Sequence, residues 1–498
     1  MKHFLICLLA IILVAIPLAS CTPKSGQPAA TAEGSGTSSA SETGEKPYLD
    51  GVKFDYPTIT IHVRGDESAV DEIGLEDYGD VLSTALYART MATMDRLDVE
   101  IAISRQNPYG TYNATINSLR NSILSAYGDY DLVAGWSPRI VPLIAENLFY
   151  DLNGLPYYNG NDAWWSRSVT DALTVGGHTY LNTGDIAATY MDSCYAVVVN
   201  QKVSSDNQYA YDSFYDIVDS GDWTLDYFYQ IVKDTYADNG NGIRDEDDTY
   251  GLVMSYDAGD CFWTSSGISI VENNGVDYPT MSYNTDYIQR VVDGVYNLMY
   301  DNIGAEVIPE KGNAAISNSI AQFTNDRSMF IILTLGRLAT LSADMSTTYG
   351  VLPVPKFDAA QEHYYTNVQQ SMSLWGVPVD VKNKEASVAV LTSLGYDSNR
   401  LVIEPHYERL LKVRYVKDST SGYMIDLIYN GIWMNFDTLY NETLGTSVTA
   451  SARVTMPAYV FRTMSKGEKT NITRWWAENQ TGLNDRLTAL LNNFFGVE

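Results

Sequence analysis

Trp136 and Arg139 form the first pair of residues whose types could bind a ligand. Both lie in the segment Gly135-Trp136-Ser137-Pro138-Arg139. An indole offers an apolar face on which a sugar ring can stack, and a guanidinium offers planar donors for the ring's hydroxyls. The pair therefore suits a small polar ring. The alternative is a Trp that packs under its own loop.

A second candidate is an Asx- and Gly-rich loop that begins at Ala237. It resembles the calcium loop of EF-hand and dockerin-like modules, with Gly242 at the turn that lets the chain reverse. The first position is Ala237 instead of Asp, which weakens the site, although Asp238 can compensate in a shifted register. Either the loop holds a structural Ca²⁺, or side-chain hydrogen bonds order it without metal. The expected ligands are Asn239, Asn241, the Ile243 carbonyl, Asp245 and Asp248.

Catalytic patterns are scarce. His62, His178, His363 and His406 belong to no Gly-x-Ser-x-Gly elbow and to no HExxH helix. The chain has 61 acidic residues, so pairs of carboxylates for glycoside hydrolysis cannot be chosen from sequence alone. We assign no catalytic residue and expect a protein that is not an enzyme and requires no cofactor.

The N-terminus predicts export and a lipid anchor. An uncharged run, Phe4 to Ala19, follows Met1-Lys2-His3 and ends in Leu18-Ala19-Ser20-Cys21. These last four residues resemble a bacterial lipobox, in which the Cys thiol, here that of Cys21, is diacylated and the preceding signal removed. The alternative is an ordinary signal peptide with an incidental Cys. We expect 1–20 to be the signal peptide and 21–47, rich in Ser, Gly and Thr, to be a flexible tether.

Composition excludes two classes of partner. The formal net charge is −29, so electrostatic binding to nucleic acid or to an anionic bilayer surface is not expected. The 498 residues suffice for two or three domains at about 150 residues each. Tyr (37) outnumbers Phe (13), which favours aromatic surfaces with hydrogen-bonding groups. Cys194 and Cys261 either form a disulfide or are two small buried residues.

The first half of the chain predicts a parallel sheet. Strand-like residues at 58–63, 99–103 and 130–134 alternate with helix-like residues at 78–97 and 116–124. This β-α-β-α-β order opens a doubly wound sheet, in which ligands bind beyond the carboxyl ends of the strands. Trp136 directly follows the third strand. Further strands are expected at 195–200, 329–333, 349–355 and 371–379, and mostly helices from 384 onward.

An ordered set of short motifs resembles the extracellular solute-binding proteins (family 1) of ABC importers, the family that includes maltose-binding protein. The resemblance implies an α/β fold of two lobes, each a doubly wound and mostly parallel sheet flanked by helices, joined by a hinge across the solute cleft. Lobe 1 would comprise 48–197 plus 375–415, and lobe 2 would comprise 198–374 plus 416–498. The motifs are the lipobox, Tyr130-Asp-Leu-Val133, Leu152-Asn-Gly-Leu-Pro156, Val175-Gly-Gly-His-Thr-Tyr180, Val197-Val-Val-Asn200, Phe323 to Phe330 and Tyr349 to Pro355.

The same resemblance extends the candidate site. Trp263 stands where the family carries cleft aromatics, Tyr190 and Asp192 precede the first crossing strand, Trp375 lies on the second crossing, and Arg337 follows a lobe 2 strand. For each, packing in the core or at the surface is the alternative.

The resemblance predicts a monomeric, lipid-anchored receptor on the outer face of the cell membrane. It would capture a mono- or oligosaccharide by closure of the lobes and deliver it to the transmembrane subunits of an ABC permease. Two rivals stay open: a secreted carbohydrate-active hydrolase, and a receptor of the same fold for peptides.

Overall fold

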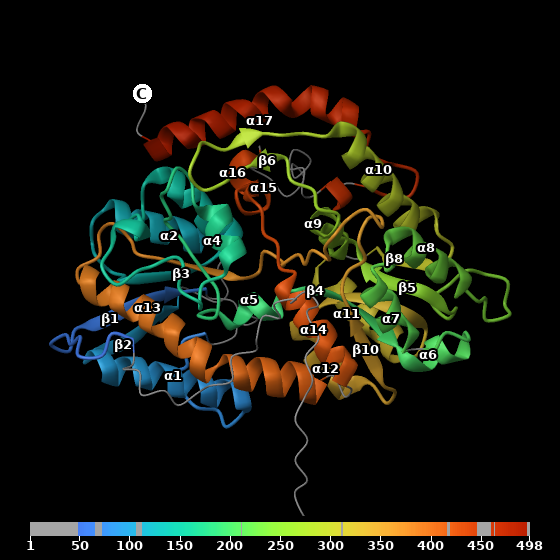
Figure 1. Cartoon of the computed structure of the whole chain (residues 1–498), viewed down its shortest axis with the longest axis horizontal. Coiled ribbons are helices and arrows are strands. Elements are labelled where there is room, and N and C mark those ends of the chain that lie inside the picture. Colours follow the sequence, from blue (N-terminus) through green and yellow to red (C-terminus); the bar gives the residue numbers. More distant parts are fainter. Residues whose placement is uncertain are drawn as a thin grey trace, which may run out of the picture. The chain divides into compact units, whose positions relative to one another are not determined.

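Two separate sheets organise the computed structural model (Figure 1). The structure describes residues 48–64, 72–105, 112–210, 212–309, 312–415, 419–445, 460–462 and 464–495, all within the unit Pro47–Glu498. Cys21, the signal peptide and the whole tether lie outside these residues. Among the described residues, no helix is both long enough and apolar enough to cross a membrane.

The first sheet has the strand order β11-β3-β1-β2. β1 pairs in parallel with β2 and with β3, whereas β11 runs antiparallel to β3 and places Ser373 opposite Trp136. Ile59, Ile61 and Leu132 are fully buried, so this sheet has a continuous apolar core. Its strands are β1 (Thr58–Val63), β2 (Glu100–Arg105), β3 (Leu132–Trp136) and β11 (Ser373–Gly376).

The second sheet has the order β10-β4-β9-β5-β8. β5 is parallel to β8 and β9, and β4 is antiparallel to β9 and β10. All six residues of β4 and of β5 are buried, because helices cover both faces of a strand in this kind of sheet. The strands are β4 (Tyr195–Asn200), β5 (Tyr250–Ser255), β8 (Ala305–Ile308), β9 (Ser328–Thr334) and β10 (Tyr349–Leu352), and a separate hairpin joins β6 (Val271–Glu272) to β7 (Thr280–Met281).

Helices connect and cover these strands. α1 begins after Asp80, whose carboxylate accepts hydrogen bonds from the backbone N–H groups of Leu82 and Ser83, and it packs against α13. The α-helices are α1 (Val81–Leu97), α2 (Tyr112–Leu124), α3 (Ser137–Ile140), α4 (Arg167–Leu173), α5 (Ala188–Asp192), α6 (Gln201–Asp206), α7 (Ser213–Ser220), α8 (Leu225–Asp234), α9 (Cys261–Ser265), α10 (Thr285–Tyr296), α11 (Asn313–Thr324), α12 (Leu338–Asp344), α13 (Lys384–Leu401), α14 (Ser419–Asn430), α15 (Phe436–Leu439), α16 (Asn441–Leu444) and α17 (Ile472–Phe495).

Shorter turns of 3₁₀ and π-helix complete the connections. They are η1 (Val141–Glu146), η2 (Leu152–Gly154), η3 (Tyr256–Asp260), η4 (Asn297–Asp301), η5 (Leu335–Arg337) and η6 (Glu404–Tyr415). α17, red in Figure 1, contacts η1, which follows the first sheet's β3, and α10, which precedes the second sheet's β8. The C-terminal helix therefore touches elements associated with both sheets.

Two segments pass between the sheets side by side. One leads from α5 into β4, and the other leads from β10 towards β11. They pair at Cys194 and Val368, where the Tyr195 N–H donates to the Asn367 carbonyl at 3.0 Å and the Gln369 N–H donates to the Ser193 carbonyl at 2.8 Å. We call residues 193–195 and 367–369 the crossing segments.

The structure confirms the predicted fold class: an α/β chain with two sheets rich in parallel pairs. β1 and β4 have the predicted bounds, and the helix expected at 78–97 begins three residues later, at Val81. The sequence did not predict β8 (Ala305–Ile308). This strand has only four residues, which is too short to show the alternation of buried and exposed side chains typical of a strand.

Candidate ligand-binding site

A cavity of about 170 Å³ opens where the ends of both sheets meet the crossing segments. Trp136 and Arg139 contribute from the first sheet, and Tyr195, η3 and α9 from the second. The second crossing segment (367–369) and the two residues after it contribute Asn367, Gln369, Gln370 and Ser371. Because β3 ends at Trp136, and β5 ends just before η3, the cavity lies beyond the carboxyl ends of parallel strands. It is lined by Trp136, Pro138, Arg139, Tyr195, Asp257, Asp260, Trp263, Asn367, Gln369, Gln370, Ser371, Thr438, Glu442 and Arg462.

Trp136 and Arg139 form one wall together. α3 starts at Ser137 directly after β3, with Pro138 in its first turn, and the Arg139 guanidinium lies 5.6 Å from the centre of the Trp136 ring. Arg139 Nη1 is also 3.4 Å from Glu442 Oε2. Cation–π attraction and this ion pair hold the guanidinium against the indole. The two residues that the sequence predicts as ligand-binding therefore line the same cavity, and their contact with a ligand stays a prediction.

Trp263 lines the cavity from α9, and contacts within the protein fix it. Only 1% of it is exposed. Its Nε1–H donates to Asp437 Oδ2 at 3.2 Å, and Asp437 Oδ1 accepts from the Ser269 hydroxyl at 2.8 Å and the Ile270 N–H at 3.2 Å. Burial raises the pKa of Asp437 to about 6. Trp263 offers the cavity a rigid edge, whereas Trp136 is only half-buried.

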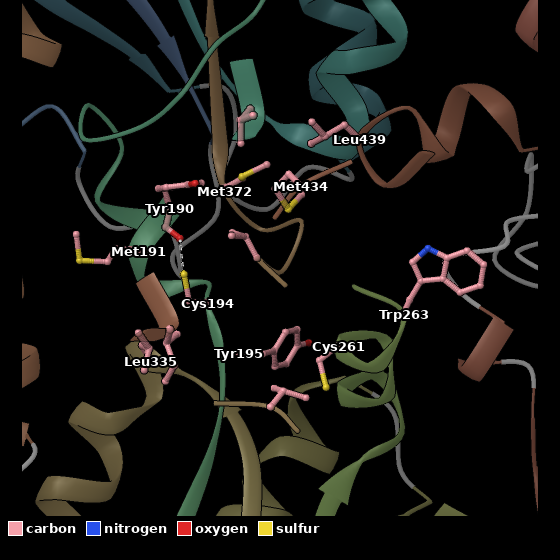
Figure 2. Close-up of a cluster of buried hydrophobic side chains, with 14 of the residues drawn as sticks. Tyr190, Met191, Cys194, Tyr195, Cys261, Trp263, Leu335, Met372, Met434 and Leu439 are labelled. Atoms are coloured by element: carbon pink, nitrogen blue, oxygen red, sulfur yellow. Dashed lines mark hydrogen bonds between the residues drawn. The ribbon is translucent and has the colours of Figure 1, made fainter. Parts of the chain in front are cut away.

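The crossing segments supply polar groups. Gln369 Nε2 donates to the Tyr195 hydroxyl at 3.1 Å, and Asn367 Nδ2 donates to Thr264 Oγ1 at 2.6 Å. Burial, with the nearby carboxylates of Asp257 and Asp260, raises the pKa of Tyr195 well above its usual value, so the hydroxyl stays protonated. Figure 2 shows Tyr195 within a buried cluster beside Cys261 and near Trp263.

Charged residues that the sequence reading missed complete the site. Arg462 forms an ion pair with Asp260, and their side chains are only 17% and 10% exposed. Asp257 and Asp260 follow β5, so the rule that ligands bind beyond parallel strands could have found them. Glu442 and Arg462 come from the C-terminal part of the chain, where no local pattern marks them.

The other predicted ligand residues lie elsewhere, and the structure gives no support for ligand contact by any of the four. Tyr190 is buried, with its hydroxyl 2.5 Å from Ser166 Oγ. Asp192 Oδ1 lies 3.0 Å from His406 Nε2. Trp375 is completely buried in β11, and Arg337 is exposed in η5. None of them lines the cavity.

The loop that resembles a calcium site closes on itself. Asp248 accepts hydrogen bonds from the Asn239 N–H, the Asp245 N–H and the Tyr236 hydroxyl. The other expected side-chain ligands of the loop are engaged as well: Asn239 Oδ1 accepts from the Asn241 N–H, Asn241 Oδ1 from the Ile243 N–H, and Asp245 from the Asp247 N–H and the Asn241 amide. Within the described chain, no group of three or more His, Cys, Asp or Glu is placed to hold a metal ion. The geometry favours a loop ordered without metal, but Ca²⁺ binding stays an untested prediction.

The two cysteines do not form a disulfide. Cys194 and Cys261 are both free and buried, and the Cys194 thiol donates to the Tyr190 carbonyl at 3.8 Å (Figure 2). The structure therefore shows the second alternative, in which the two cysteines are small buried residues. Burial raises the pKa of each thiol.

A second hollow, of about 910 Å³, lies on the far side of α15. Phe436 lines it, whereas Thr438 of the same helix lines the smaller cavity. Several of its polar groups are already engaged with one another: Arg167 pairs with Asp171, and Asn274 Nδ2 donates to Asp277. We therefore take the smaller cavity, with its two Trp residues, as the candidate site.

Comparisons with known proteins show the fold. No family model and no curated protein matches the chain. Similar solved structures include the galacto-N-biose/lacto-N-biose I-binding protein of a Bifidobacterium longum ABC transporter, in complex with lacto-N-biose (14% identity, 88% of this chain and 98% of that chain covered, TM-score 0.56). Others are a Rhizobium etli sugar transporter in an open conformation (12%, 87% and 99%, 0.54) and an Alicyclobacillus acidocaldarius extracellular solute-binding protein of family 1 (12%, 89% and 100%, 0.52). The chain has the two-lobe fold of these binding proteins.

Proposed function

We propose that the protein is the substrate-binding component of an ABC importer, which captures a mono- or oligosaccharide and performs no chemistry. One observation carries this proposal: a single cavity, built from both sheets and the crossing chain, holds Trp136 and Trp263 together with polar and charged side chains. Aromatic faces and hydrogen-bonding groups are what a sugar ring requires. Similar structures whose descriptions name sugars support the ligand class.

Binding would close the two lobes about the crossing segments. We propose the division into lobe 1 (48–197 plus 375–415) and lobe 2 (198–374 plus 416–498) from the sequence resemblance, and the crossing segments 193–195 and 367–369 lie near two of these bounds. A ligand that touches both walls stabilises the closed state by its differential contacts. The permease subunits would then recognise the closed, loaded form.

Anchoring is a proposal from sequence. A diacylated Cys21 followed by the tether would hold a monomeric protein on the extracytoplasmic face of the membrane, since two acyl chains anchor stably where one is marginal. Metabolic labelling with a radioactive fatty acid should label the wild-type protein and not a Cys21→Ser variant. Equal labelling of both, or no labelling of the wild type, would contradict this anchor.

Thermal unfolding against a panel of saccharides and peptides tests the function. A true ligand raises the melting temperature, and the rise continues with the logarithm of ligand concentration above the Kd, because the ligand binds only the folded state. Isothermal titration then measures its Kd, and chromatography of the recovered ligand shows whether it is intact. The proposal is refuted if only peptides stabilise the protein, if no compound stabilises it, or if the recovered sugar is shorter than the one added.

A further inference from the structure

The cavity contains an unbalanced set of charges. Five charged side chains line it: the carboxylates of Asp257, Asp260 and Glu442, and the guanidinium groups of Arg139 and Arg462. Arg139 pairs with Glu442, and Arg462 pairs with Asp260. Among the described residues that line the cavity, the carboxylate of Asp257 is therefore left without a cation, and the wall carries one net negative charge.

One oxygen of the Asp257 carboxylate is also without a hydrogen-bond donor in the part of the chain that the structure describes. Its Oδ1 is shielded from solvent and has no hydrogen-bond partner among the described residues. The same is true of the Thr438 hydroxyl, whose residue is only 4% exposed and lines the same cavity. A shielded polar atom without a partner costs free energy, most of all when it is charged. These two atoms are thus positions at which a ligand can supply what the protein does not.

The charge decides which donor fits best. A sugar hydroxyl can donate to Asp257, but the negative charge of the wall stays uncompensated. An ammonium group donates and also neutralises the charge, and the attraction is stronger where water is partly excluded. The formal charge of the whole chain, −29, also attracts cations and repels anions such as sugar acids and sugar phosphates.

On the basis of the proposed function, we propose that the cavity is selective for saccharides that carry a free amino group, and that Asp257 is the residue that binds the ammonium. Trp136 would then stack on the ring, while Arg139 and Arg462, held by their carboxylate partners, donate to its hydroxyls and ring oxygens. Thr438 accepts from or donates to a neighbouring hydroxyl.

The test uses sets of probes that differ in one substituent. Glucosamine, glucose and N-acetylglucosamine form one set, galactosamine, galactose and N-acetylgalactosamine a second, and chitobiose, cellobiose and N,N′-diacetylchitobiose a third. Titration at about pH 6 keeps the amines protonated. We expect the amino member of at least one set to bind about tenfold or more tighter than its neutral members, which is the size of a hydrogen bond to a charged group.

Two variants separate the role of Asp257 from a general effect of charge. Asp257→Asn keeps the shape of the side chain and should abolish the preference for the amine while changing the Kd of the neutral probe by less than about threefold. Asp219→Asn, which alters an exposed residue near the end of α7 outside the cavity, removes the same charge from the chain and should leave the preference intact. Melting temperatures of both variants show that they fold.

The outcomes are distinct. If a saccharide binds but amino and neutral probes bind equally, or if Asp257→Asn weakens both equally, the selectivity is refuted and the proposed function stands. If Asp219→Asn also removes the preference, the global charge and not Asp257 is responsible, and the assignment is wrong. If no saccharide of the probe sets or of the wider panel binds, the proposed function falls and the selectivity with it.

Discussion

Trp136 and Trp375 allow a matched test of where ligand binding resides. They lie on neighbouring antiparallel strands, but Trp136 is half-buried and lines the cavity, whereas Trp375 is completely buried. We expect Trp136→Leu to weaken binding with little effect on stability, and Trp375→Leu to lower stability with little effect on binding. Replacing either residue removes one indole from the same sheet, so each variant is the control for the other.

The magnitudes follow from the contacts. Loss of the Trp136 ring removes a stacking platform for the ligand, worth about 0.5–1.5 kcal/mol. This loss corresponds to a Kd about 2- to 13-fold weaker. Trp375→Leu leaves a cavity in the core and should lower the free energy of unfolding by about 2–4 kcal/mol, somewhat less than truncation to Ala.

The assay is titration of each variant with the best saccharide of the panel, together with urea unfolding. If Trp375→Leu weakens binding as much as Trp136→Leu does, the cavity is not the binding site. If Trp136→Leu leaves the Kd unchanged, the stacking role of Trp136 is refuted even where stability behaves as expected.

Three further predictions concern stability. Burial raises the pKa of Asp185 and Asp437 to about 6, above the value near 4 of an unfolded chain. The contribution of these two carboxyl groups to the free energy of unfolding is therefore full below about pH 4 and is lost as the pH rises through about 6. The difference in unfolding free energy between wild type and Asp437→Asn should therefore fall over this range, and a difference that is flat or rises would contradict it. Burial lowers the pKa of His406, but the Asp192 carboxylate outweighs this effect and raises the pKa overall. The contribution of the pair to the free energy of unfolding is therefore present at low pH and is lost as the pH rises above the ordinary His value of about 6.5. His406→Gln should remove this pH dependence in urea titrations. Because the predicted calcium ligands are bonded within the loop, a chelator should leave the melting temperature unchanged while Asp248→Ala lowers it, and a drop on chelation would show that the loop holds a metal.

The sequence predicted those features that depend on the order of neighbouring residues along the chain. The alternation of strands and helices predicted the first sheet, and the position of Trp136 after its third strand placed that residue in the cavity. Trp375 shows the limit of the same reasoning. Ser373–Gly376 is a strand with every residue buried, and a buried strand has no alternation that tells which side chain faces a ligand.

Long-range contacts account for what sequence reasoning did not find. Arg462 reaches Asp260, and Glu442 reaches Arg139, across hundreds of positions of the chain. Nothing near Glu442 or Arg462 in the sequence marks either as part of a site. Tyr190 and Asp192 lie beside the crossing segments, as predicted, but do not line the cavity, and their polar atoms bond within the protein to Ser166 and His406. Ligand contact by these two residues stays a prediction.

The late position of Thr438, Glu442 and Arg462 in the chain has a consequence for biogenesis. An exported polypeptide emerges from its N-terminus, and domains begin to fold as they emerge. Both sheets are complete once β11 has crossed, yet the cavity still lacks one wall and the partners of Arg139 and Asp260. Under the proposed function, the binding site is therefore complete only when the last part of the chain has been delivered, and a prematurely terminated product that lacks Thr438, Glu442 and Arg462 would not bind the ligand.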